Sequence, residues 1–294
     1  MQAARVKSFA ISSMGVLCGT AVAIHDQYWS WRFLIAWLGS IAIQAGTNLT
    51  NISYNYKGSG RGPGILADTR SSSAVVHAGW LTPQQVRRGG FLCFALGIAC
   101  GLVLVWLCGP AILWLGLPAV IAGYSYAGPP LRLGYLGLGV ITVFIFMGPV
   151  MVGGAYYVMA LRFALDAFAA SIPIGLLAAG IMHVNDVRDY ASDVTHGKRT
   201  LATLTGRTGA SHTLAFIDGA AYLATIAAVI AGALPWLTLA VLVTIPRALG
   251  QIKLVYRENS VDALHDAWLR GVKLHTEFGI LLIAGLLASA VFKL

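Results

Sequence analysis

The chain has 294 residues, of which 57% are hydrophobic and only 11% are charged, and its formal net charge is +9. A soluble domain carries about 25% charged residues, so this composition excludes an ordinary water-soluble globular protein. The mean hydropathy of +0.75 predicts an integral membrane protein.

Apolar segments near the length needed to cross about 30 Å of hydrocarbon recur along the whole chain. They predict an all-α fold, a polytopic membrane bundle of about nine transmembrane helices joined mostly by short loops. We expect a single integral membrane domain over residues 1–294. The predicted spans cover residues 8–24, 33–54, 90–108, 110–127, 138–159, 164–185, 211–231, 233–250 and 274–292.

The placement of the basic residues predicts the orientation, because short cytoplasmic loops collect Lys and Arg. With the N-terminus in the cytoplasm, only Arg32, Arg162 and Lys293 of the 20 basic residues fall on the other side. We therefore expect a multi-pass protein of the inner (cytoplasmic) cell membrane with a basic cytoplasmic face. The positive charge indicates topology rather than nucleic-acid binding, although such a face would also attract a diphosphate.

Three carboxylates gather at the end of the sixth apolar segment. Asp186, Asp189 and Asp193 are spaced i, i+3 and i+7, so a continuous helix would place them on one face, with Asn185 one turn before Asp189. Carboxylates this close repel one another beside a bilayer, where screening is poor, so a cation is expected among them. The pattern predicts a site for magnesium and a diphosphate, and a solvated acidic helix end is the alternative.

A second polar stretch, Gly46-Thr-Asn-Leu-Thr-Asn-Ile-Ser-Tyr-Asn-Tyr-Lys57, ends the second apolar segment. It looks like a weak internal repeat of the aspartate segment, so two helices would deliver polar side chains to one shared cavity. Two further loops are expected on the same side of the membrane. Tyr124 to Tyr135 is rich in aromatics and turn residues and favours an interfacial belt over contact with a flat substrate. Arg257 to Leu274 predicts a short amphipathic helix that lies on the membrane surface or covers the site.

The run from Asn185 to Ala202 resembles the second aspartate-rich motif of the UbiA superfamily of membrane prenyltransferases. It is most similar to the branch that prenylates 1,4-dihydroxy-2-naphthoate for menaquinone. Thr47 to Lys57 occupies the place of the first motif, and the pattern of that branch continues in Asp68-Thr-Arg70-Ser-Ser-Ser and Gly134-Tyr-Leu-Gly-Leu-Gly139. The resemblance covers most of the chain.

The resemblance implies transfer of a polyprenyl group from a polyprenyl diphosphate to an aromatic acceptor, with 1,4-dihydroxy-2-naphthoate as the leading candidate. It implies that Asp186, Asp189 and Asp193 are catalytic and bind magnesium, with Asn48 as a further metal ligand. Expected partners are the donor, the acceptor and the lipid bilayer. The residues expected to bind substrate are Asn48, Asn51, Asn55, Lys57, Arg70, Arg132, Asn185, Arg188, Lys198 and Arg199.

The chain departs from the family pattern in its first motif, where acidic residues are replaced by Ile52 and Asn55. An acid is also usual at the position of Val140. We therefore expect weak metal binding at the first motif, or a single-metal mode, since an amide supplies an oxygen ligand without charge. Three alternatives stay open: a prenyl diphosphate cyclase, a prenyltransferase with a different acceptor, and a catalytically degenerate isoprenoid-binding relative.

Overall fold

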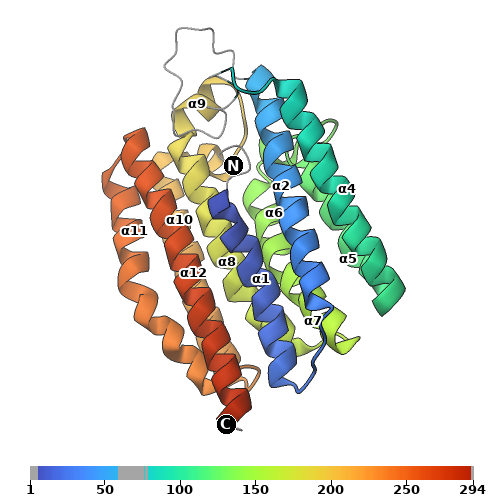
Figure 1. Ribbon diagram of the computed structural model, residues 1–294. Coiled ribbons are helices and arrows are strands. Elements are labelled where there is room, and N and C mark those ends of the chain that lie inside the picture. Colours follow the sequence, from blue (N-terminus) through green and yellow to red (C-terminus); the bar gives the residue numbers. More distant parts are fainter. Residues whose placement is uncertain (1–5, 59–75, 77–78, 293–294) are drawn as a thin grey trace.

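The computed structural model describes residues 6–58, 76 and 79–292, and nearly all of these lie in helices (Figure 1). Two short 3-10 segments, η1 (Leu133–Tyr135) and η3 (Trp236–Thr244), and one π-helical segment, η2 (Phe146–Val150), complete the bundle. The α-helices are α1 (Val6–His25), α2 (Phe33–Gly58), α4 (Pro83–Cys108), α5 (Ala111–Ser125), α6 (Gly139–Ile145), α7 (Met151–Ala160), α8 (Leu165–Arg188), α9 (Tyr190–Thr195), α10 (Leu201–Ile230), α11 (Ile245–Arg257) and α12 (Val261–Phe292).

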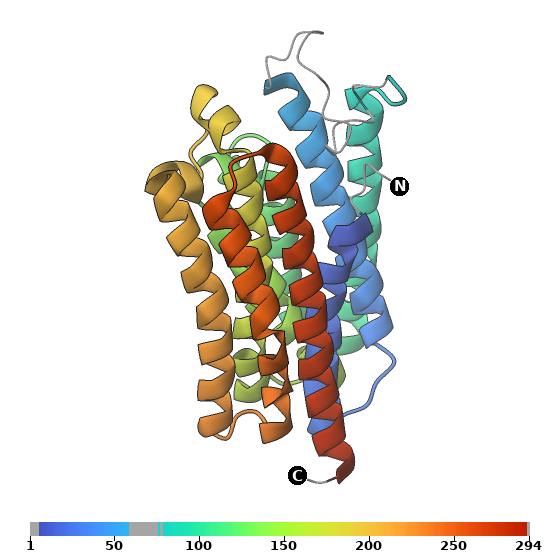
Figure 2. The ribbon, with the colours of Figure 1, turned by 90° about the vertical axis from the view of Figure 1, so that its left-hand side faces the viewer.

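Eight helical segments in the described part of the chain are long and apolar enough to cross a membrane. One of them joins α6, η2 and α7, and another joins η3 and α11. The apolar helix α5 has only 15 residues and makes a shorter ninth segment. The long helices run side by side in both views (Figures 1 and 2). The all-helical membrane bundle expected from the sequence is therefore confirmed, and the count agrees with about nine.

The surface of the bundle carries the features of a membrane-embedded protein. Large apolar side chains are exposed along the helices, where lipid would cover them. Trp29, Trp106 and Trp114 are 74%, 84% and 83% exposed, and all three lie at the end of the bundle away from α9. Tryptophan gathers at membrane–water interfaces, so this end marks one edge of the hydrocarbon layer.

Two elements differ from the sequence-based expectation. The segment expected as a separate amphipathic helix is instead the first part of α12, which runs unbroken from Val261 to Phe292. Its Gly271 packs against Gln251 of α11, where an added Cβ would lie 2.8 Å from the amide nitrogen. The helix α10 also begins at Leu201, earlier than predicted, where the hydroxyl of Thr200 accepts a hydrogen bond from the backbone amide of Thr203. It is interrupted at Gly206, whose φ of 73° and ψ of 168° are not helical, so the early start is a short helical turn and the long membrane-crossing helix follows Gly206.

The segment η2 crosses α8 at very short range, and this contact explains two glycines. A Cβ on Gly148 would lie 2.8 Å from the Cα of Gly175 and 2.8 Å from the carbonyl oxygen of Ser171. The neighbouring Pro149 lies inside the helical segment and cannot donate a backbone hydrogen bond, which accounts for the local π-helical turn. Glycine on both sides therefore permits the close approach of η2 to α8.

We expect Gly148→Ala to destabilise the bundle by about 1–3 kcal/mol, because the methyl group would force η2 away from α8. The matched control is Gly153→Ala in α7, where an added Cβ meets no atom within 4 Å. Thermal unfolding in detergent measures the difference. Equal Tm values for the two variants would contradict the close packing of η2 on α8.

Candidate active site

The aspartate motif, which contains Asp186, Asp189 and Asp193, lies where α8 gives way to α9 at the upper end of Figure 1. The helix is interrupted at Asp189, whose φ of −89° and ψ of 4° are not those of a regular helix. The amide of Asp189 still donates to Asn185, and that of Asp193 donates to Asp189. The three aspartates are therefore carried by two consecutive helices and not by the one continuous helix that their spacing predicted.

The three carboxylates have different surroundings. Asp186 is only 3% exposed, and it makes no hydrogen bond or ion pair with any other residue that the structure describes. Asp193 is also buried, and its Oδ2 lies 3.0 Å from Nζ of Lys198. The side chain of Asp189 is 38% exposed and accepts two hydrogen bonds from Arg188, at 2.9 and 3.0 Å. Asp186 is thus a buried acid without a bonded partner.

The pKa values of the ionisable groups beyond the end of α8 are shifted by burial and by the neighbouring charges. Burial raises the pKa of the Asp193 carboxyl, and the nearby Lys198 opposes this only in part. Burial lowers the pKa of Lys198, but the carboxylates of Asp193 and Asp186 outweigh it, so that the pKa rises. Lys198 therefore stays protonated as a partly buried cation beside the two carboxylates.

The polar stretch from Gly46 to Lys57, which takes the place of the family's first motif, forms a ladder of amides on one face of α2. Asn55 donates to the side-chain oxygen of Asn51, and Gln44 donates to Asn48 at 3.4 Å. Asn48 donates in turn to the hydroxyl of Ser8 in α1, at 2.8 Å. These amides hydrogen-bond to neighbouring polar groups and bring no charge. The side chain of Lys57 and the whole of Arg70, both expected near a diphosphate, lie outside the residues that the structure describes.

Ile52 does not share the face of this ladder. It is 4% exposed and packs in a small apolar cluster with Leu49, Val76 and Val86. The position that carries an acid in the resembling family is therefore an apolar packing position in this chain.

Tyr135 of η1 connects the two motifs. Its hydroxyl donates to Oδ1 of Asn55 at 2.6 Å, and Nζ of Lys198 lies 5.6 Å from the centre of its ring. Arg132 approaches the same ring, with its guanidinium carbon 5.9 Å from the centre. The backbone joins the same regions, because the amide of Gly137 donates to the carbonyl of Arg199 at 2.9 Å. The prediction of an interfacial belt for this loop did not include the contacts of Tyr135 with Asn55 and Lys198.

Burial raises the pKa of the Tyr135 phenol, with Lys198 and Arg132 opposing the shift. Tyr135 therefore acts as a neutral donor to Asn55. The sequence held one signal for this role: the tyrosine follows a Gly-Pro-Pro turn, and that turn folds the loop back over the helix ends.

A cavity of about 270 Å³ leads from these motifs into the bundle. Ser8, Gln44, Asn48, Asn51 and Asn185 line its polar end, whereas most of the remaining wall is apolar. No Asp, Glu, Lys or Arg of the described residues lines it. Helices α1, α2, α4, α5 and α8 and the segment from α6 to α7 form the wall, which Trp268 of α12 completes. The cavity can hold a long apolar group whose polar head lies near Asn185.

The residues present suit a magnesium ion that is bound together with a substrate. No three carboxylate, histidine or cysteine side chains in the described ranges come close enough to form a metal cage of their own. Magnesium is commonly held by one or two carboxylates while it keeps waters and shares substrate phosphates. The buried Asp186 and Asp193 provide such a donor set, and Lys198 adds a cation for a phosphate.

Known proteins share both the sequence pattern and the architecture. The model of the UbiA prenyltransferase family matches residues 12–274. The 1,4-dihydroxy-2-naphthoate octaprenyltransferase of Bacillus subtilis (strain 168) is 30% identical over 98% of this chain and 92% of its own length. The 2-carboxy-1,4-naphthoquinone phytyltransferase of Synechocystis sp. is 27% identical over 94% of this chain and 89% of its own length.

Solved structures show the same fold at low sequence identity. A UbiA homologue from Aeropyrum pernix K1, in its apo form, superposes with a TM-score of 0.72 at 15% identity and covers 97% of this chain and 98% of its own. A homologue from Archaeoglobus fulgidus, bound to DMAPP and Mg2+, gives 0.65 at 14% identity over 96% of this chain and 98% of its own. With the family pattern matched from residue 12 to residue 274 on this bundle of membrane helices, the chain belongs to the UbiA prenyltransferase family.

Proposed function

We propose that the protein transfers a polyprenyl group from a polyprenyl diphosphate to 1,4-dihydroxy-2-naphthoate in a magnesium-dependent reaction. The observation that carries the proposal is the cavity, which joins a polar end at Asn185, the residue before the buried Asp186, to a mostly apolar wall. An isoprenoid diphosphate has the same division into a charged head and an apolar tail. The naphthoate and naphthoquinone prenyltransferases among the relatives support this class of acceptor.

In this proposal Asp186, Asp189 and Asp193 hold magnesium, and Lys198 donates to the diphosphate oxygens. Bound magnesium would supply charge neutralisation as the leaving group departs. The bond between the allylic carbon and the diphosphate oxygen breaks with its electron pair on oxygen, and a carbon of the electron-rich ring bonds to the allylic carbon. That ring carbon then releases the group it carried, a proton or its carboxylate as carbon dioxide, and the electron pair of the broken bond returns to the aromatic ring. The apolar wall excludes water, which would otherwise capture the cation.

The amide ladder gives this protein a neutral first motif. We propose a single-metal mode in which the side-chain amides of Asn48, Asn51 and Asn55 bind the substrate. Tyr135 holds Asn55 in place, and Arg132, Arg188 and Arg199 lie near the same end as further phosphate contacts. Arg188, whose side chain is 16% exposed, would have to release the 38% exposed Asp189 in order to bind a phosphate.

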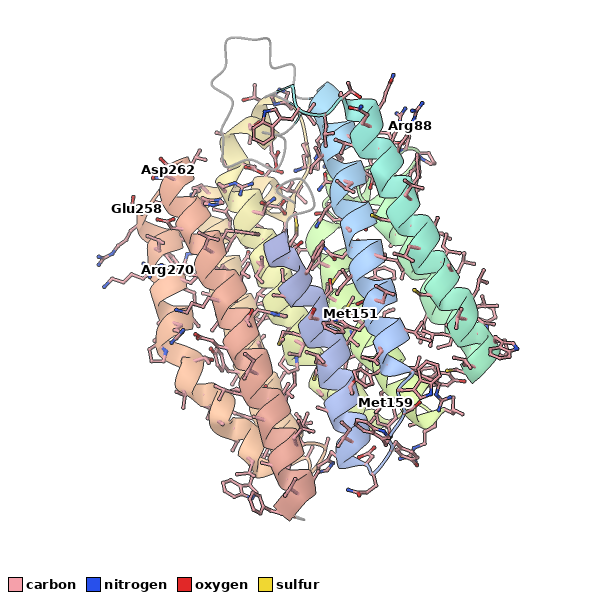
Figure 3. The ribbon with its side chains drawn as sticks, viewed as in Figure 1. Arg88, Met151, Met159, Glu258, Asp262 and Arg270 are labelled. Atoms are coloured by element: carbon pink, nitrogen blue, oxygen red, sulfur yellow. The ribbon has the colours of Figure 1, made fainter. Side chains whose placement is uncertain are left out.

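We place the end that carries α9 on the cytoplasmic side of the inner membrane. Figure 3 shows charged residues at this end, with Arg88 on α4 and with Glu258 and Asp262 near the junction of α11 and α12. The tryptophans described above mark the opposite edge. In sealed inverted inner-membrane vesicles, where the cytoplasmic face is outside, a membrane-impermeant thiol reagent should label Arg88→Cys and not Trp106→Cys. Labelling of Trp106→Cys alone would contradict the orientation.

The function is tested with purified protein, 1,4-dihydroxy-2-naphthoate and a polyprenyl diphosphate, with magnesium or with a chelator. We expect prenylated ring and diphosphate only when donor, acceptor and magnesium are all present. A cyclic hydrocarbon formed from the donor alone would identify a cyclase, and a product made only with a phenol would assign a different acceptor. Tight donor binding without diphosphate release under any condition would identify a non-catalytic isoprenoid-binding protein.

We expect Tyr135→Phe to lower kcat/KM by about two- to twelvefold, because the lost hydrogen bond to Asn55 is worth about 0.5–1.5 kcal/mol. Tyr135→Leu also removes the ring beside Lys198 and should lower it further. The matched control is Tyr256→Phe, which removes another bonded hydroxyl, 2.7 Å from His212, away from both motifs. Steady-state rates that fall equally in the Tyr135 and Tyr256 variants would contradict a bridging role for Tyr135.

A further inference from the structure

The hydrogen-bonding capacity of Gln44 is only half used. This partly buried side chain lines the cavity from α2, and it makes two long hydrogen bonds with other described residues. Its Nε2 donates to Oδ1 of Asn48 at 3.4 Å, and its Oε1 accepts from the hydroxyl of Ser12 in α1 at 3.3 Å. A primary amide has two N–H donors and two lone pairs on its oxygen, so one of each is left for a ligand.

The hydroxyl-bearing side chains on the same wall are satisfied within α2. Thr47 and Ser40 also line the cavity. The hydroxyl of Thr47 donates to the carbonyl of Ile43 at 3.0 Å, and that of Ser40 donates to the carbonyl of Trp37 at 2.8 Å. Gln44 therefore presents a donor and an acceptor at a depth where the neighbouring hydroxyls are turned back onto their own helix.

Gln44 lies just below the place proposed for the diphosphate. Helix α2 runs from the far end of the bundle up to the end that carries α9 (Figure 1). Gln44 precedes Asn48 by four residues and is therefore about 6 Å deeper, at about 1.5 Å per residue. In the proposed reaction the allylic carbon is joined directly to the diphosphate, and the attacking ring carbon has to approach it to about 3–3.5 Å. With the diphosphate at the level of Asn48, the acceptor ring lies beside Gln44.

The chemistry of the acceptor matches this amide. No Asp, Glu, Lys or Arg of the described residues lines the cavity, so the polar groups of a ring held there need neutral partners. In 1,4-dihydroxy-2-naphthoate the hydroxyl next to the carboxylate can hydrogen-bond to it within the molecule. The remote hydroxyl has no such neighbour, and leaving it unpaired in a mostly apolar cavity is unfavourable.

We propose that Gln44 binds the ring hydroxyl remote from the carboxylate and thereby selects a dihydroxy acceptor. This inference rests on the proposed function, which it extends from a class of acceptor to the residue that recognises it. The hydroxyl donates to the unused lone pair of Oε1, and this hydrogen bond leaves more electron density on the ring that attacks the allylic carbon. Ser12 is buried behind the wall and orients the amide through its own bond to Oε1.

Gln44→Met tests the assignment, because methionine keeps nearly the same length of side chain and removes the amide. The probes are 1,4-dihydroxy-2-naphthoate and 1-hydroxy-2-naphthoate, which lacks the remote hydroxyl, and isothermal titration in detergent measures the Kd of each. We expect Gln44→Met to raise the Kd of the dihydroxy ring at least about fivefold and to leave that of the monohydroxy ring within about twofold. In steady-state assays the KM for the acceptor should rise, whereas the KM for the polyprenyl diphosphate should stay within about twofold.

The matched control is Ser40→Ala, one turn below Gln44 on the same wall, where the lost hydroxyl is bonded within α2. It should change neither Kd. Equal weakening of both rings in folded Gln44→Met, an unchanged Kd for the dihydroxy ring, or a rise in KM for the diphosphate alone would overturn the inference. Gln44→Leu gives the same comparison if the methionine variant does not fold.

The experiment separates this inference from the proposed function. Unmodified protein that binds 1,4-dihydroxy-2-naphthoate but transfers no prenyl group to it contradicts the function, and the two Kd values still decide the role of Gln44. Protein that prenylates the naphthoate with the same Kd before and after Gln44→Met keeps the function and overturns the inference. Unmodified protein that does not bind the naphthoate contradicts both.

Discussion

Asp186→Asn should lower the rate of magnesium-dependent diphosphate release by about a hundred- to thousandfold while the protein stays folded. Asp186 is buried and has no bonded partner among the described residues, so its charge is available to a cation. The amide keeps the shape and one oxygen ligand but removes the charge that holds the ion. Initial rates across a magnesium titration measure the loss, and a higher magnesium requirement should accompany it.

The matched control is Asp218→Asn. Asp218 is equally buried, at 2% exposure, but lies in α10 against Gly180 of α8 and does not line the cavity. Removing its charge should leave the rate within a few fold. Similar losses in the two variants would mean that burial of an acid, rather than its place at the end of α8, explains the effect, and the magnesium assignment would fail.

Ile52→Asp and Asn55→Asp should have opposite outcomes, although both restore an acid that the resembling family carries in its first motif. Ile52 packs with Val76 and Val86, so a carboxylate there is buried without a partner and should cost about 3–5 kcal/mol. Asn55 lies on the amide ladder beside Tyr135, so a carboxylate there adds negative charge to the site. We expect a lower half-saturating magnesium concentration for Asn55→Asp and a lower Tm for Ile52→Asp.

The conservative variant Ile52→Val controls for loss of packing and should cost only about 0.5–1.5 kcal/mol. Magnesium titrations of activity and thermal unfolding of all three variants complete the comparison. A stable Ile52→Asp protein with tighter magnesium binding would show that this face of α2 points toward the metal, and the position of Ile52 in the apolar cluster would then be wrong.

The order and approximate bounds of the spans could be predicted from the sequence, because hydropathy and length are local properties of each segment. The two polar stretches could also be found, since amides and carboxylates at the ends of apolar runs stand out in composition. The break at Asp189 could not be predicted, because the spacing of three aspartates is compatible with one helix or with two. The unbroken run of α12 through the segment predicted as a separate surface helix, with Gly271 packed against Gln251 of α11, is a contact between helices that no local pattern displays.

The sequence alone determined the class of the protein, a helical membrane bundle with one end rich in amides, carboxylates and basic residues, because lipid requires long apolar helices whatever their arrangement. Only the tertiary structure decided which face each helix turns inward. It directed Ile52 into an apolar cluster, brought Tyr135 from a distant loop to Asn55, and formed a cavity with a polar end and a mostly apolar wall. These contacts join residues far apart in the chain, so they arise from packing between helices and not from the propensities of any one segment.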